Sequence, residues 1–147
     1  MEFSESVYER FNKYLSSYLI QGWKQDKFYI KSVEVESKKM VVLVDIHESY
    51  LPYLSSLPAI PLLYQFGIFF SCWESGFSEK TGDIYLRSLD IETPRMIQKT
   101  EDIKFELNLV KKRKLKEWFF YIVDFNIDDN AFTGKMQYAV PLPKIVD

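Results

Sequence analysis

The chain has 147 residues, of which 47% are hydrophobic and 17% aromatic, and its formal net charge is −2. This composition is typical of one folded domain with its own core, and it excludes an intrinsically disordered chain. No apolar run reaches the roughly 18 residues of a membrane span. The first residues, MEFSESVYERF, lack the layout of a signal peptide, so we expect a cytoplasmic protein.

Residue types that bind metals are scarce. The sequence has one cysteine, Cys72, and one histidine, His47. A disulfide needs two cysteines, and most zinc sites need several Cys or His ligands, so we expect no disulfide and no metal site. We also expect no other cofactor. The one dense basic run, KKRKLK at Lys111–Lys116, is short compared with a nucleic-acid footprint. We therefore expect no nucleic-acid partner, and we interpret the run as a solvated turn.

The first predicted element is an amphipathic helix over Ser4–Leu19, within an N-terminal extension of residues 1–24. Ser6 and Glu9 have the spacing of a capping box. Apolar residues then recur every three or four positions: Val7, Phe11, Tyr14, Leu15, Tyr18 and Leu19. One face of such a helix must be covered.

Two strands and a second helix are predicted next. The strands are Lys27–Glu36 and Lys39–His47, which we expect to pair. From Pro61 the apolar residues recur at helical spacing, and intervening positions such as Cys72 are apolar too. This pattern predicts a central helix over Pro61–Ser75 that is buried almost all round, with Cys72 as a small buried hydrophobe.

Four further strands complete the pattern: Asp83–Ile91, Asp102–Val110, Glu117–Ile127 and Ala131–Val140. Asp102–Val110 alternates apolar and polar residues, as a strand with one solvated face does, and NIDDNAF supplies the last hairpin turn. The order predicts one α+β domain, residues 1–147, in which an antiparallel sheet wraps around the central helix. That architecture is the hot-dog fold.

One stretch, YLPYLSSLPAIPLLYQFG, resembles the loop-to-helix signature HFPGxPxxPGVLxxE of the β-hydroxyacyl-acyl-carrier-protein dehydratases. LPAIPLL matches it through Pro58, Pro61 and Leu63, and YLP resembles the histidine-led triplet. Downstream, IETPRM resembles the family's F-R-R-P-V, and EDIKFELNLVKKRK resembles its G-D-x-L strand and the basic stretch after it. The resemblance covers most of the chain from about Lys27.

The resemblance implies a protein of fatty acid or polyketide metabolism that binds a thioester of acyl-carrier protein or coenzyme A. Its N–H groups at the start of the central helix would polarise the thioester carbonyl. The matching substrate-binding positions are Pro61, Leu62, Leu63, Tyr64 and Gly67. The resemblance also implies a homodimer, or a heterodimer with a homologue, through edge-to-edge pairing of sheets. An acidic carrier protein would suit the basic run.

The family's catalytic histidine and glutamate are missing. The glutamate position falls on Gly67, and the histidine position falls on Tyr50, or on Tyr53 without a gap. Tyrosine is a poor base at neutral pH because its unperturbed pKa is about 10. Dehydration of a hydroxyacyl thioester needs a base and an acid across the substrate, so we expect this reaction to be altered or lost.

Three nearby residues are candidate substitutes. A small shift of the alignment would place Gln65 at the family's glutamate position, where its amide could bind a carbonyl. Glu74 lies about 10 Å along the helix from Gly67. His47 could act as a base with Asp45, or it is a surface histidine.

Three functions stay open: a dehydratase-like enzyme with altered chemistry, such as a thioesterase with Glu74 or Asp45 as base; a non-catalytic acyl-binding or partner subunit; and a small-ligand-binding domain of a different α+β fold.

Overall fold

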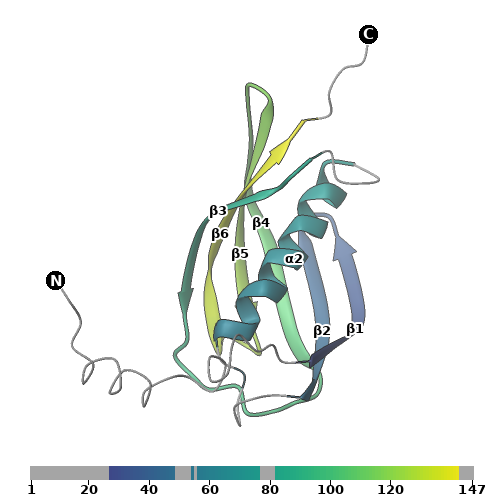
Figure 1. Cartoon of the computed structure of the whole chain (residues 1–147), viewed down its shortest axis with the longest axis vertical. Helices are drawn as coiled ribbons and strands as arrows, with labels where there is room; N and C mark the ends of the chain where they lie inside the picture. The colour runs from purple at the N-terminus through teal and green to yellow at the C-terminus, as the bar shows by residue number, and fades with distance from the viewer. Residues whose placement is uncertain (1–26, 49–53, 55, 77–81, 143–147) are drawn as a thin grey trace, which may run out of the picture.

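The computed structural model describes residues 27–48, 54, 56–76 and 82–142 (Figure 1). The predicted N-terminal helix and the candidates Tyr50 and Tyr53 lie outside these residues. The described elements are, in chain order, β1 (Lys27–Glu36), β2 (Lys39–Glu48), α2 (Ser56–Glu74), β3 (Tyr85–Glu92), β4 (Ile103–Leu115), β5 (Trp118–Ile127) and β6 (Phe132–Pro141).

The strands form one antiparallel sheet in the order β1-β2-β4-β5-β6-β3. The sheet curves around α2, which lies across its concave face (Figure 1). This arrangement confirms the predicted hot-dog fold. The order of elements along the chain is also as expected, and most strand boundaries agree within two residues.

The core fills the space between α2 and the concave face. Every second residue of β2, β4 and β5 points towards the helix, as in Val42, Phe105 and Val123, all of them buried. From α2, the Phe66 ring meets the Phe105 ring edge-on at 5.3 Å between centroids. Among the described residues, no helix is both long and apolar enough to cross a bilayer.

The central helix begins earlier than predicted. α2 starts at Ser56, so Pro58 lies within the helix and not before it, and Pro61 lies inside the helix and not at its start. Pro58 is tolerated in the first turn, where a backbone N–H has no acceptor in the helix. Pro61 lies one turn further on, where its missing N–H leaves the carbonyl of residue 57 without the usual helical donor.

The basic run is a strand for most of its length, and its interpretation as a turn is wrong. β4 continues to Leu115 and pairs with β5 as far as Trp118, so only Lys116 and Glu117 form the turn. Aromatic side chains of β5 support the pairing: the Lys112 ammonium lies 4.3 Å from the centre of the Phe119 ring.

The prediction that α2 is buried almost all round is also wrong. Leu63, Phe66 and Phe70 are buried, but Phe69 and Trp73 are exposed. The sheet covers one side of the helix only, and the described residues leave the outer flank in contact with solvent. Cys72, in contrast, is buried as expected.

Candidate functional site

The N-terminal end of α2 is the site that the sequence resemblance indicates. The N–H of Leu54 donates to the carbonyl of Ile97 at 2.8 Å, and both side chains are buried. The chain just before the helix is thereby bound to the connection between β3 and β4, residues 93–102. Helix N–H groups of the first turn have no acceptor within a helix, so this end of α2 can interact with a carbonyl or anion.

The connection 93–102 is anchored at the turn between β5 and β6. The Asp128 carboxylate accepts from Lys99 Nζ at 2.8 Å and from Arg95 Nη1 at 3.3 Å. Burial works against ionisation of this carboxyl, but the hydrogen bonds from Lys99 and Arg95 hold its pKa below the usual range. A second anchor is the N–H of Ile46, which donates to the carbonyl of Thr100 at 2.8 Å.

Gly67, at the family's glutamate position, lies against the ring of Tyr138 on β6. A Cβ atom at position 67 would overlap that ring, so the helix has no room for a side chain here. The Tyr138 hydroxyl donates to the carbonyl of Leu63 at 2.7 Å. Burial raises the pKa of this hydroxyl above its usual range, which keeps the proton on the oxygen.

The predicted substrate-binding residues do not share one surface. Pro61 is exposed, Leu62 is half-buried and Leu63 belongs to the core. The Tyr64 hydroxyl donates to the carbonyl of Ile84 at 2.7 Å, which ties α2 to the chain just before β3. Gly67 is buried beneath Tyr138.

The catalytic candidates within the described residues are dispersed. Gln65 is exposed on the outer side of α2, and Glu74 ends the helix, about 27 Å from its start at 1.5 Å per residue. His47 is exposed near the end of β2, and its ring stacks on Tyr29 with 5.7 Å between centroids. The structure thus separates these three candidates.

The Asp45 carboxylate has partners other than His47. Its Oδ1 accepts from the backbone N–H of Asp102 at 2.8 Å, and Oδ2 lies 3.9 Å from Lys31 Nζ. Lys31 also binds the Asp102 carboxylate at 2.6 Å. These contacts assign Asp45 to holding the start of β4 against β2.

Two contacts at this end were not anticipated from the sequence. The sequence pattern assigns Tyr138 to a strand and Asp128 to the turn in NIDDNAF, and it predicts neither contact. The local sequence signal for Asp128 is the run of Asp128, Asp129 and Asn130, residue types that tolerate the positive φ that all three adopt. The signal for Tyr138 is long-range, because its hydroxyl binds a carbonyl 75 residues away.

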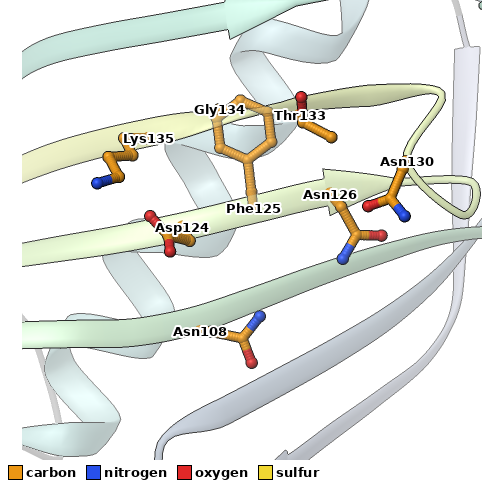
Figure 2. Close-up of a pocket in the computed structure, with 8 residues that line it drawn as sticks. All are labelled: Asn108, Asp124, Phe125, Asn126, Asn130, Thr133, Gly134 and Lys135. Carbon is orange, nitrogen blue, oxygen red and sulfur yellow. The ribbon is translucent and has the colours of Figure 1, made fainter.

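An open groove lined mainly by polar residue types lies on the other face of the sheet, away from α2, with a volume of about 370 Å³. Figure 2 shows its lining residues on β4, β5, β6 and the β5–β6 turn, which are Asn108, Asp124, Phe125, Asn126, Asn130, Thr133, Gly134 and Lys135. One oxygen of Asp124, Oδ1, is buried without a hydrogen-bond partner. None of the site residues predicted from the sequence lines this groove.

Comparison with known proteins finds solved structures of similar fold. No protein-family model and no curated protein matches the chain. A crystal structure of a mutant of the thioesterase PA1618 from Pseudomonas aeruginosa matches with a TM-score of 0.56 and 11% identity, over 97% of both chains.

Two streptococcal structures match with a TM-score of 0.51. A mutant hypothetical thioesterase from Streptococcus pneumoniae is 10% identical over 78% of this chain and 89% of that one. The protein smu.793 from Streptococcus mutans, bound to acetyl CoA, is 12% identical over 80% and 92%. At these identities the likeness concerns the fold, and the chain shares its hot-dog fold with structures of thioesterases.

Proposed function

We propose that this protein binds an acyl thioester at the N-terminal end of α2 and hydrolyses it, without the dehydration expected of a β-hydroxyacyl dehydratase. The thioester carbonyl would accept hydrogen bonds from first-turn N–H groups of α2, which increases its reactivity towards water. The acyl group is transferred to water and the carrier leaves as a thiol. Coenzyme A and a carrier protein are both compatible with this chemistry.

The observation that carries the proposal is the contact between Gly67 and Tyr138. In the dehydratase family that the sequence resembles, the catalytic glutamate aligns with Gly67. In this protein the Tyr138 ring fills the space that a side chain at position 67 would need. Tyr138 itself is poorly suited to replace the acid, because its hydroxyl is buried and already donates to Leu63. The fold likeness to thioesterase structures supports hydrolysis as the alternative reaction.

A non-catalytic binding role is the second candidate, and the charged groups near the start of α2 favour it. In the described part of the chain, the Asp128 carboxylate is engaged by Lys99 and Arg95, and the Asp45 carboxylate by Lys31 and the N–H of Asp102. Neither is placed as a base for water. A protein of this kind would bind the thioester without turning it over.

The test is to incubate the purified protein with saturated, 3-hydroxy and enoyl thioesters of coenzyme A and of a carrier protein. Free thiol and double-bond absorbance are followed together. We expect thiol release without double-bond formation or hydration. Saturable binding with neither signal would favour the binding role, and double-bond formation from the 3-hydroxy substrate would overturn the proposal.

Substitutions locate the reacting groups. If Gln65 orients the thioester, Gln65→Ala should lower kcat/KM about tenfold or more, a loss of about 1.4 kcal/mol of transition-state stabilisation. Tyr50→Phe and Tyr53→Phe test the two positions aligned with the family's histidine. Gln137→Ala is the matched control, because Gln137 on β6 faces away from α2 and should leave turnover unchanged.

A further inference from the structure

The feature that the proposed function leaves unexplained is an apolar surface on the outer flank of α2 and the neighbouring edge of the sheet. We define the α2–β1 surface as Ile30, Val33, Phe69 and Trp73, whose exposed fractions are 43%, 46%, 42% and 56%. The Phe69 and Trp73 rings stack on each other with 6.2 Å between centroids. Grouped large apolar side chains on a surface usually mark a place where another segment docks.

The two halves of this surface lie on the same side of the sheet. Ile30 and Val33 on β1 pair with Val44 and Val42 on β2, which point towards α2 and are buried. Residues paired across neighbouring strands share a face, so Ile30 and Val33 also point to the α2 side. Figure 1 shows β1 beyond the flank of α2.

The side chain of Trp73 also points towards the β1 edge of the sheet. Tyr64 faces the opposite edge, because its hydroxyl binds the carbonyl of Ile84 just before β3. Trp73 follows Tyr64 by nine residues, which is two and a half turns of α-helix. Its side chain therefore leaves α2 on the side opposite to Tyr64, and this is the side of β1.

We propose that the N-terminal segment Ser4–Leu19 docks as a helix on the α2–β1 surface, with its apolar face against Phe69 and Trp73. The segment precedes β1 directly, and the apolar stripe predicted for it must be covered by another apolar surface. Sixteen helical residues would measure about 24 Å, close to the roughly 28 Å of the 19-residue α2. Residues 20–26 can span about 23 Å when extended, which is enough to turn the chain back onto α2.

The start of β1 supports this path. Lys27 pairs with Glu48 at the end of β2, and the starts of β1 and α2 lie at the same end of the molecule (Figure 1). A helix leading into Lys27 therefore begins its contact near the start of α2 and can follow α2 towards Trp73. The partner of the surface is thus a segment of the same chain. This inference is independent of the thioester chemistry.

The experiment uses the emission of Trp73 in the full chain, with Trp23 and Trp118 replaced by Phe. Phe11→Asp places a charge on the apolar face of the segment, and Ser16→Asp, on the opposite face of the predicted helix, is the matched control. We expect Phe11→Asp to shift Trp73 emission to longer wavelength and to increase its quenching by acrylamide about twofold. Ser16→Asp should change neither.

A second variant lacks residues 1–24 and should reproduce the effect of Phe11→Asp. Far-UV circular dichroism of each variant checks that the sheet is intact. Equal quenching of Trp73 in the parent, Phe11→Asp and the shortened chain would overturn the proposal. Protection of Trp73 that disappears on dilution of the parent would assign the surface to a second copy, and this also overturns it.

Discussion

Gly67 is the residue at which the helix backbone and the ring of Tyr138 come together. We expect Gly67→Ala to lower the free energy of unfolding by about 1–3 kcal/mol, because the added methyl group overlaps the ring. A loss of stability would identify the overlap with the ring as its cause, because alanine is otherwise favoured over glycine within a helix by about 1 kcal/mol. Urea denaturation measures the difference.

The control for this substitution removes the ring. In a Tyr138→Val background, Gly67→Ala should no longer lower the free energy of unfolding, because the methyl group then occupies the space that the ring has left. If Gly67→Ala were as stable as the parent protein, the close contact would not constrain the helix.

Asp128 predicts a dependence of stability on pH. Its folded-state pKa is lowered, so its paired carboxylate contributes stability above the unfolded-state pKa of about 4 and loses it as pH falls through the lower folded value. We expect Asp128→Asn to cost about 1–2 kcal/mol at pH 7, given that Lys99 and Arg95 are half-exposed, and progressively less in acid.

Asp129→Asn is the control for Asp128. The Asp129 side chain is largely exposed and lies 3.6 Å from Lys104, so its removal should change stability little at any pH. Both residues have positive φ, which asparagine tolerates well, so neither substitution strains the turn. Equal effects of the two substitutions on thermal unfolding would contradict the assignment of Asp128 as the anchor.

At the scale of elements, the two prolines of α2 predict effects of opposite sign. Pro61 is exposed, and Pro61→Ala restores an N–H for the carbonyl of residue 57. We expect the free energy of unfolding to rise by about 1–2 kcal/mol, less than the full cost of an internal proline because the unfolded chain also becomes more flexible. Pro58 is buried in the first turn, and Pro58→Ala should lower stability by about 1–2 kcal/mol through lost packing. Losses of similar size from both changes, measured by urea denaturation, would contradict this account.

The elements also show what local pattern can and cannot predict. Alternation in Ile103, Phe105 and Leu107 correctly predicts the buried face of β4, because the period of a strand depends only on neighbouring residues. The basic run lacks such alternation, and its strand is stabilised by aromatic residues of β5 that its own sequence does not contain. The pattern does not predict the exposure of Phe69 and Trp73, because the sequence of an apolar residue is the same on a covered and on an uncovered flank of a helix.

The candidate site is less predictable than the fold for the same reason. The resemblance aligns Gly67 with the family's glutamate, but it does not reveal that the ring of Tyr138, far away in the sequence, fills the space that a side chain at position 67 would need. The pairing of Asp45 with Lys31 and Asp102 likewise depends on two strands and the connection before β4. Contacts of this kind follow from the assembled sheet, so a search along the chain does not find them.

At the scale of the whole molecule, the two outer strands of the sheet, β1 and β3, each pair with one described neighbour. Free strand edges favour association, and natural proteins usually cover or disrupt them. We expect a dimer through one of these edges, with a mass near twice 17.5 kDa by analytical ultracentrifugation.

Hydrogen exchange at two protein concentrations would identify the edge, because amides of the pairing strand gain protection as dimers form. A monomeric mass at micromolar concentration, with no change of protection in β1 or β3, would contradict this expectation.

The strand order has a consequence for folding during synthesis on the ribosome. β3 pairs with β6, from Tyr85 opposite Ala139 to Glu92 opposite Thr133. While β6 is still inside the exit tunnel, β3 has no adjoining strand in the described sheet, and α2 lacks the hydroxyl of Tyr138 for the carbonyl of Leu63. The nascent chain must therefore hold an unpaired strand and an apolar helix until β6 emerges, and chaperone binding during this period would oppose aggregation.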